Sequence, residues 1–178
     1  MFEPILFSLW LIPAQPINSS LVTYVNDLSE HYHSPSFQPH VTLFCGKTKN
    51  LESTLSTIKK MSAQISPLTL SVTGVEATNE YYKSVFITLS NSSELNSFFQ
   101  QARTLDLQSQ YVLMPHLSLL YQNLPLAQKQ DIANKIQSSL NIQSITFDRI
   151  QVMTDIDQEG SSAVKSWRVL YRGNLGHG

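Results

Sequence analysis

One six-residue pattern occurs twice in this chain, as PHVTLF beginning at Pro39 and as PHLSLL beginning at Pro115. Each copy reads proline, histidine, aliphatic residue, hydroxyl residue, leucine and apolar residue. Side chains alternate between the two faces of a strand, so the histidine and the hydroxyl two residues later should point the same way. The two pairs are His40 with Thr42 and His116 with Ser118. Each copy is therefore expected to present one imidazole and one hydroxyl from a half-buried strand.

Two such strands side by side would combine two imidazoles with two hydroxyls, a set that suits hydrolysis of a phosphate ester. One imidazole can take a proton from water while the other gives a proton to the leaving oxygen. Free histidine titrates near pH ~6.5, so this division of labour needs only small shifts. Thr42 and Ser118 can donate hydrogen bonds to the phosphate oxygens on which charge builds. The alternative is two ordinary buried strands whose histidines are satisfied by backbone partners.

The doubled motif resembles the signature of the two-histidine (2H) phosphoesterase superfamily, in which H-x-[ST]-hydrophobic occurs once in each half of a duplicated fold. Two further segments, SLWLIP at residues 8–13 and WRV at residues 167–169, are similar to its cyclic phosphodiesterase branch. The resemblance implies that His40 and His116 are the catalytic residues and that Thr42 and Ser118 bind phosphate. It also favours His116 as the group that activates water and His40 as the acid.

The same resemblance implies a metal-independent hydrolase without a cofactor. Its substrates would be small cyclic nucleotides: ADP-ribose 1″,2″-cyclic phosphate, opened to the 1″-phosphate, and nucleoside 2′,3′-cyclic phosphates, opened to 2′-phosphates. Two alternatives remain open. One is an enzyme of RNA ends, either a 2′,3′-cyclic phosphodiesterase or a 2′-5′ RNA ligase-like protein. The other is a non-enzymatic nucleotide-binding module on the same fold, because fold alone does not decide function.

Three aromatic residues are candidates for contact with the substrate. Trp10 can form a wall of the cleft or part of the core. Tyr82, with Tyr81 beside it, can stack on a nucleobase or begin a strand with an apolar contact. Tyr121 lies three residues after Ser118, an odd step that turns it to the other face unless the strand bends there. The family resemblance nevertheless favours Tyr121 as a substrate contact.

The charge balance indicates a small ligand. The chain has 12 basic and 13 acidic residues and a formal net charge of −1. A protein that follows a long nucleic acid needs a basic track, and the chain has only four arginines. We therefore expect a small nucleotide substrate and no long nucleic acid. A monomer is also expected.

Cys45 is the single cysteine, so an intrachain disulfide is excluded, and a reducing cytoplasmic location is expected. By strand alternation Cys45 shares a face with Val41 and Leu43, which indicates a core thiol rather than a nucleophile. The apolar run at residues 5–12 is too short to span a membrane and is read as a buried strand.

No metal site is expected. His31 and His33 precede His40, but their spacing does not match the usual structural zinc patterns, and thiolate ligands are lacking. Exposed loop histidines are the simpler interpretation.

Apolar spacing predicts the elements that must hold the two motifs in place. Strands are expected at residues 3–12, 39–45, 68–75, 81–89, 115–121, 145–154 and 163–171, with a polar loop at 155–162. Helices are expected from Asn18 or Ser19 to about His31, over 51–61, from Ser92 or Ser93 to 102, and over 124–140. The pattern predicts one α+β domain over residues 1–178, made of two pseudo-symmetric lobes. The superfamily resemblance implies two antiparallel sheets facing a central cleft, with helices outside.

Overall fold

The computed structural model describes residues 3–155 and 161–176. The strands in them are β1 (Ile5–Pro13), β2 (Val41–Thr48), β3 (Leu68–Ala77), β4 (Val85–Leu89), β5 (His116–Leu120), β6 (Ser144–Thr154) and β7 (Arg168–Asn174). The helices are α1 (Ile17–Tyr32), α2 (Leu51–Gln64), α3 (Ser93–Arg103), α4 (Leu126–Ser139) and α5 (Ser161–Ser166), with a short 3-10 helix η1 (Tyr81–Lys83). The predicted succession of strands and helices is confirmed as far as β6.

Within the described residues the strands form one antiparallel seven-stranded sheet, in the order β2-β1-β6-β3-β4-β5, with β7 paired to β6. The α+β class is confirmed, but the expectation of two separate sheets is wrong. The reason lies in β3, which is long enough to have different partners along its length. Its residues 68–71 pair with β6, and the residues from 72 to 77 pair with β4. One strand therefore carries the hydrogen bonding from one half of the sheet into the other.

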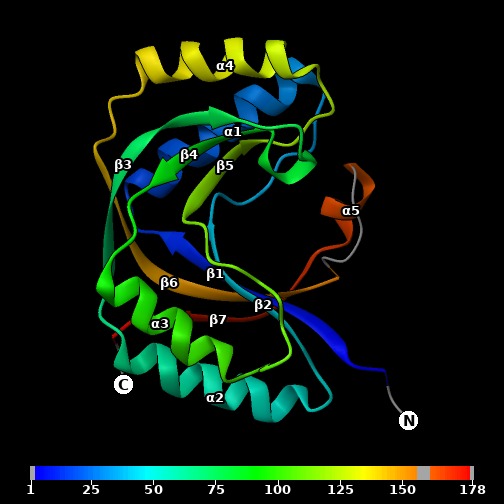
Figure 1. Ribbon diagram of the computed structural model, residues 1–178, viewed down its shortest axis with the longest axis vertical. Helices are drawn as coiled ribbons and strands as arrows, with labels where there is room; N and C mark the ends of the chain where they lie inside the picture. The colour runs from blue at the N-terminus through cyan, green and yellow to red at the C-terminus, as the bar shows by residue number, and fades with distance from the viewer. Residues whose placement is uncertain (1–2, 156–160, 177–178) are drawn as a thin grey trace.

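The sheet has two arms that meet at β3 (Figure 1). We call β4, β5 and residues 72–77 the upper arm, and β1, β2, β6 and β7 the lower arm. Helices α1 and α4 pack on the upper arm, whereas α2 and α3 pack on the lower arm, so the helices lie at the two outer ends of the molecule. Helix α1 follows β1 in sequence but covers the other arm, where it contacts β5. The two halves of the chain are thus interleaved.

Side-chain caps mark the beginning of two helices, α2 and α3. Asn50 caps α2 by accepting a hydrogen bond from the Ser53 backbone N–H at 3.0 Å. Ser92 caps α3 in the same way, accepting from Leu95 N–H at 3.1 Å, as one of the two predicted caps. The predicted cap of α1 at Asn18 or Ser19 is wrong, because this helix begins at Ile17 directly after Pro16 and has no side-chain cap.

Two predicted segments differ from the structure, and a third lies mostly outside the described residues. Tyr81 and Tyr82 belong to η1 and not to the following strand, which begins at Val85. The last strand begins at Arg168, and the short α5 occupies residues 161–166, where that strand was expected to start. Most of the predicted polar loop at 155–162 lies outside the described residues.

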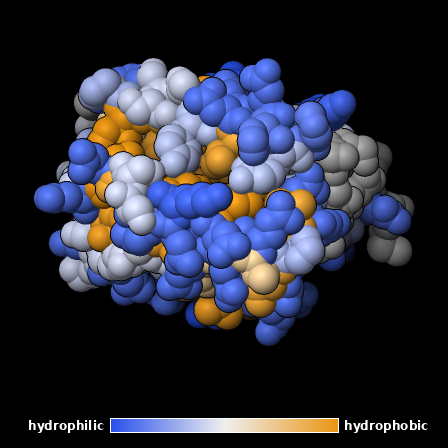
Figure 2. Space-filling model, turned by 90° about the horizontal axis from the view of Figure 1, so that it is seen from above, coloured by the Kyte–Doolittle hydropathy of each residue, from blue (hydrophilic) through white to orange (hydrophobic). Residues whose placement is uncertain are grey.

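The core lies along both faces of the bent sheet and is largely aliphatic and aromatic. One face of α3 packs into this core, with Leu95, Phe98, Phe99 and Ala102 all buried. Seen from the α4 side, the surface is mostly polar, with apolar residues visible between the polar ones (Figure 2). No helix in the described part of the chain combines the length and the apolar character that a membrane crossing needs.

Candidate active site

A central cavity of about 250 Å³ lies between the two arms. Every candidate site residue named from the sequence lines it: Trp10, His40, Thr42, Tyr82, His116, Ser118 and Tyr121. The lower arm supplies Trp10 from β1 and supplies His40 and Thr42 from the beginning of β2. The upper arm supplies Tyr82 from η1, His116 and Ser118 from β5, and Tyr121 from the residue after β5. The two sequence motifs, far apart in the chain, therefore meet at one cavity.

A β-bulge interrupts each motif strand at the same place. On β2, Phe44 pairs with Leu9 and Thr42 pairs with Trp10, so Leu43 is an extra residue. On β5, Leu120 pairs with Val85 and Ser118 pairs with Phe86, so Leu119 is an extra residue. A bulge of one residue reverses the alternation of the side chains that follow it.

The two bulges bring one further side chain from each strand to the cavity. Cys45 and Tyr121 each lie three residues after the motif hydroxyl, and both line the cavity. The bend that Tyr121 needed is therefore present. The prediction that Cys45 is a core thiol on the face of Val41 is wrong, because the bulge turns Cys45 to the opposite face, where it is half-buried. Burial raises the pKa of the Cys45 thiol, which does not favour a thiolate nucleophile.

Both histidines are held in the same tautomer. The Nδ1 atom of His40 lies 2.7 Å from the carbonyl oxygen of Gln38, and that of His116 lies 2.7 Å from the carbonyl oxygen of Met114. A carbonyl oxygen only accepts, so Nδ1 carries the proton and donates it in both rings. In the neutral imidazole Nε2 is then unprotonated and can accept a proton. Both histidines thus have the backbone partners expected of ordinary buried strands, yet both rings also line the cavity.

The surroundings of the two imidazoles disfavour their charged forms to different degrees. Burial lowers the pKa of His40 from 6.5 to about 3, an effect that outweighs the hydrogen bond to Gln38, and the nearby His116 lowers it further. Burial also lowers the pKa of His116, with a hydrogen bond to Met114 acting against it. Lys83 lowers the pKa of His116 and Glu80 raises it. His40 is thus firmly neutral at physiological pH.

Trp10 covers one face of His40. The two rings are stacked, with centroids 3.5 Å apart and planes 6° from parallel. The Trp10 Nε1–H donates to Ser8 Oγ at 2.9 Å, and the Cys45 thiol donates to the same oxygen at 3.3 Å. Trp10 is therefore both a buried residue and a wall of the cavity, which combines the two interpretations that the sequence allowed.

Trp167 also lines the cavity and extends the aromatic wall formed by Trp10. Its ring lies edge-on to Trp10 at 5.2 Å and near Tyr82 at 5.8 Å and Tyr121 at 6.1 Å. Tyr121 in turn stacks on Phe37 at 3.8 Å. Faces of this kind can hold a nucleobase without strong selectivity.

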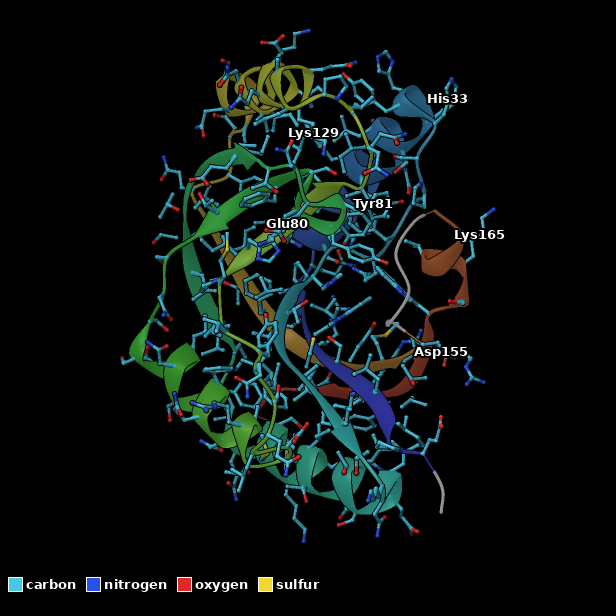
Figure 3. All side chains as sticks on the ribbon, turned by 45° about the vertical axis from the view of Figure 1, so that its right-hand side comes forward. His33, Glu80, Tyr81, Lys129, Asp155 and Lys165 are labelled. Carbon is cyan, nitrogen blue, oxygen red and sulfur yellow. The ribbon has the colours of Figure 1, made fainter. Side chains whose placement is uncertain are left out.

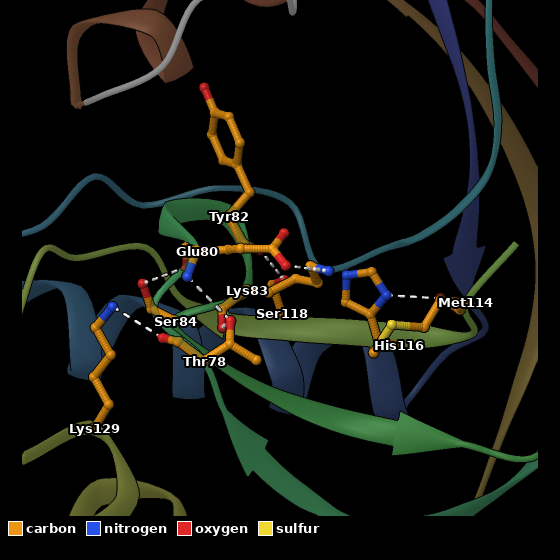
Figure 4. Close-up of polar contacts among 9 residues, drawn as sticks. All are labelled: Thr78, Glu80, Tyr82, Lys83, Ser84, Met114, His116, Ser118 and Lys129. Carbon is orange, nitrogen blue, oxygen red and sulfur yellow. Dashed lines mark hydrogen bonds and ion pairs between the residues drawn. The ribbon is translucent and has the colours of Figure 1, made fainter. Parts of the chain in front are cut away.

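A basic group stands next to His116. Figure 4 shows the Lys83 ammonium beside the imidazole of His116, paired with the Glu80 carboxylate at 2.9 Å. The loop that carries this pair is held by Thr78, whose hydroxyl donates to the Lys83 carbonyl oxygen at 2.6 Å. The buried Lys129 on α4 donates to the Thr78 carbonyl oxygen at 3.1 Å. These contacts fix a positive charge within reach of an anionic substrate.

The Ser118 hydroxyl also joins the loop to the motif strand. It donates to the carbonyl oxygen of Tyr82 at 2.7 Å (Figure 4). Ser84 strengthens the same junction by donating to the Gln122 carbonyl oxygen at 2.8 Å. A substrate phosphate near Ser118 would compete for a hydroxyl that is already oriented.

Sequence reasoning missed some of the cavity lining. Ser8 shares a face with Trp10 by simple alternation, so the only polar residue in an apolar run was a usable signal. Tyr111 was not foreseen, because residues 107–113 carry no regular periodicity and adopt no helix or strand. Lys83 also lines the cavity, and nothing in its local sequence distinguishes it from a solvated lysine.

The described residues contain no group of three or more histidine, cysteine, aspartate or glutamate side chains that could hold a metal ion. His33 lies at the end of α1, well away from Glu80 and Tyr81 (Figure 3). Neither His31 nor His33 lines the central cavity. His31 and His33 therefore do not join His40 at the central cavity.

Two comparisons by sequence point in the same direction. Residues 6–172 match the model of a family described as cyclic phosphodiesterase-like protein. The chain is also similar to the cyclic phosphodiesterase of Arabidopsis thaliana, with 22% identity over 174 residues that cover 95% of this chain and 94% of the relative.

Solved structures share the fold at low sequence identity. E. coli LigT in its apo form superposes with a TM-score of 0.59 at 12% identity, covering 98% of this chain and 99% of the other. LigT complexed with 3′-AMP gives a TM-score of 0.57 at 12% identity, with coverage of 97% and 99%. The protein TT0787 of Thermus thermophilus gives 0.58 at 12% identity, again with coverage of 97% and 99%.

Proposed function

Because this chain belongs to the cyclic phosphodiesterase-like protein family and is a phosphodiesterase, we propose that it hydrolyses cyclic phosphates of small nucleotides by two-histidine acid–base catalysis. The proposed substrates are ADP-ribose 1″,2″-cyclic phosphate, opened to the 1″-phosphate, and nucleoside 2′,3′-cyclic phosphates, opened to 2′-phosphates. The observation that carries the proposal is the pair of imidazoles at one cavity, each with its Nδ1 proton held by a backbone carbonyl.

Catalysis needs one neutral and one protonated imidazole on opposite sides of phosphorus. The stronger lowering of the His40 pKa supports His40 as the neutral base that activates water. His116 is then the acid that protonates the leaving oxygen, and the anionic substrate favours its charged form. This assignment reverses the one expected from the family resemblance. It rests on the deeper burial of His40 beneath Trp10.

The hydroxyls and the lysine act on the phosphate itself. Thr42 and Ser118 come from opposite arms, so they can donate to different non-bridging oxygens as charge builds on them. Lys83 adds a positive charge on the side of His116. The aromatic wall of Trp10, Tyr82 and Trp167 offers a face for the base. These roles need no metal ion, because the proton transfers and charge stabilisation come from side chains.

The cavity has room for the reacting phosphate and for only part of a mononucleotide. Its volume of about 250 Å³ is just below the usual range for small-molecule sites, roughly 300–1,000 Å³. A nucleoside cyclic phosphate therefore has to leave part of its sugar or base outside the cavity.

The test is hydrolysis of 2′,3′-cyclic AMP and ADP-ribose cyclic phosphate in EDTA, with phosphorus NMR to identify the products. We expect a 2′-phosphate and a 1″-phosphate. His40→Ala and His116→Ala should each lose at least about 10²-fold in kcat. His31→Ala removes an exposed histidine outside the cavity and should match the wild type. Full activity in both cavity variants would refute the two-histidine mechanism.

A further inference from the structure

A second cavity lies beside the first, along β2. This side groove measures about 560 Å³, more than twice the volume of the central cavity. Cys45 and Tyr111 line both spaces, so these two residues form the boundary between them. Nothing in the proposed mechanism uses it.

Alternation along β2 places a row of side chains from one space into the other. After the bulge at Leu43, Cys45 faces the central cavity, and every second residue beyond it faces the same way. The next such residue is Lys47, which lines the side groove together with Lys49, the residue that follows the end of β2 at Thr48. Along β2 and just beyond it, the proposed catalytic hydroxyl of Thr42 is followed by the Cys45 thiol and then by the exposed ammonium groups of Lys47 and Lys49.

The opposite wall of the groove is tied to β2 along its length. This wall is the connecting segment at residues 104–115. Its Tyr111 hydroxyl donates to the Thr42 carbonyl oxygen at 2.8 Å, and its Ser109 Oγ donates to the Cys45 carbonyl oxygen at 2.6 Å. The Asp106 carboxylate accepts the Lys47 backbone N–H at 2.8 Å. The groove is thus bounded by fixed backbone on both sides.

Gly46 makes this close approach possible. A Cβ atom at this position would lie 2.8 Å from the Phe44 ring and 3.0 Å from the Cβ of Asp106. Any side chain would push the connecting segment away from β2. The groove is therefore shaped by the local sequence of β2.

The chemistry of the lining suits an anion with hydrogen-bonding groups attached. Lys47 and Lys49 supply two positive charges, and Gln108 and Gln110 supply amides that can both donate and accept. Asp106 opposes them with one negative charge, which already accepts hydrogen bonds from the backbone N–H groups of Lys47 and Gln108. The ionisable groups that line the groove therefore sum to a positive charge.

We propose that the side groove is a second subsite for the phosphate or pyrophosphate carried on carbon 5 of the sugar whose cyclic phosphate is cleaved, together with the nucleoside beyond it. This inference rests on the proposed function, since it takes the central cavity as the reacting site. Among the substrates already proposed, it ranks ADP-ribose cyclic phosphate, which carries a pyrophosphate on carbon 5, above mononucleotides without a 5′-phosphate. A groove of this volume and two lysines match one additional nucleotide unit. A longer RNA would need further basic contacts.

The experiment compares ligands that differ only in the group on carbon 5. For turnover, the pair is 2′,3′-cyclic AMP and its 5′-phosphorylated form, with ADP-ribose cyclic phosphate as the full substrate. For binding without turnover, the pair is adenosine 2′-phosphate and adenosine 2′,5′-bisphosphate, measured by calorimetry at fixed salt. The variant is Lys47→Gln with Lys49→Gln. The matched control is Lys60→Gln with Lys135→Gln, which removes the same charge from exposed helix positions.

We expect the groove variant to lose about tenfold in kcat/KM for the 5′-phosphorylated substrates, a loss of about 1.4 kcal/mol. Its kcat/KM for 2′,3′-cyclic AMP should match that of the wild type, and the control should leave all substrates unchanged. Equal losses for both members of a pair, or no loss, would overturn the subsite. An RNA dinucleotide with a terminal cyclic phosphate is the competing substrate. If its kcat/KM exceeds that of 2′,3′-cyclic AMP by as much as the kcat/KM of ADP-ribose cyclic phosphate does, the preference for pyrophosphate-linked substrates is overturned.

The two proposals can fail separately. If no cyclic phosphate is turned over, the proposed function fails. Binding of adenosine 2′-phosphate and adenosine 2′,5′-bisphosphate still tests the groove, because it needs no turnover. A tighter dissociation constant for the bisphosphate in the wild type, lost in the groove variant and kept in the control, would support the subsite. The same constant for both ligands would reject it.

Discussion

The indole of Trp10 lies flat against the imidazole of His40, with centroids 3.5 Å apart, and so shields from water the group on which the proposed chemistry depends. The stack explains why a histidine at the mouth of a motif strand is only 8% exposed. It also links the first strand of the chain to the reacting centre through one contact.

Replacing Trp10 by leucine should raise the pKa of His40 from about 3 towards the ordinary value of 6.5. Water would then reach one face of the ring and solvate its charged form. Nitrogen-detected NMR titration of the imidazole measures the change directly. Trp167→Leu is the matched control, because that indole lies edge-on to Trp10 and Tyr121 and tilted to Tyr82, whereas Trp10 is the ring stacked on His40. An unchanged His40 titration in Trp10→Leu would show that other groups cause the burial.

The neutral, buried His40 should make the protein sensitive to acid. The unfolded chain takes up a proton near pH 6.5 and the folded chain only near 3, so the free energy of unfolding falls as the pH drops through that window. The contribution is on the order of 3–5 kcal/mol. His40→Asn keeps a donor for Gln38 but cannot titrate, so its stability should depend less on pH. Urea unfolding from pH 7 to 3 compares the two; parallel curves would contradict the prediction.

A sulfur leaving group should separate the acid from the base. In a 2′,3′-cyclic phosphate with sulfur at the 3′ bridging position, the leaving thiolate needs no protonation. We expect His116→Ala to recover at least about tenfold on this substrate, relative to the oxygen compound, and His40→Ala to recover nothing. The measurement is steady-state turnover of both compounds by both variants. The reverse pattern would assign His40 as the acid.

Each motif hydroxyl should contribute mainly to kcat. Thr42→Val and Ser118→Ala remove donors to the developing charge, and each should lower kcat by about 10²-fold with a smaller change in KM. Thr42→Ser keeps the hydroxyl and should remain close to the wild type. Steady-state kinetics on 2′,3′-cyclic AMP measure both parameters. A rise in KM alone would indicate uniform binding of the phosphate instead.

Cys45 should be dispensable for catalysis and yet able to block it. Cys45→Ser should keep hydrolysis near the wild-type rate, because the raised thiol pKa leaves little thiolate at neutral pH. N-ethylmaleimide should inactivate the wild type slowly, by filling the cavity, and leave Cys45→Ser unaffected. Loss of activity in the serine variant would mean that the thiol has a chemical role.

The motif residues were predictable from the sequence because their signal is local and repeated. His40, Thr42, His116 and Ser118 stand at fixed spacing on short apolar strands, and simple alternation places each pair on one face. Helix α3 was predictable for the same reason. Ser92 marks its beginning, and the spacing of its apolar residues marks its buried face.

The rest depended on pairing partners that a single strand does not reveal. The bulges at Leu43 and Leu119 arise from the register with β1 and β4, so Cys45 was placed on the wrong face and Tyr121 needed a bend that alternation did not give. Likewise, nothing in β3 alone tells which strand lies beside each half of it. Tyr111 reaches the cavity from an irregular segment that is positioned by hydrogen bonds to β2.

The two partners of β3 also bear on how the molecule unfolds. Residues 68–71 are paired with β6 and residues 72–77 with β4, so neither arm can lose its strands without exposing the edge of the other. Helix α1 adds a second tie, since it leaves β1 and packs against β5. Native-state hydrogen exchange should therefore find one cooperative unit that includes both arms, although the six-residue motif occurs once in each arm. The two motif strands would be lost together or kept together.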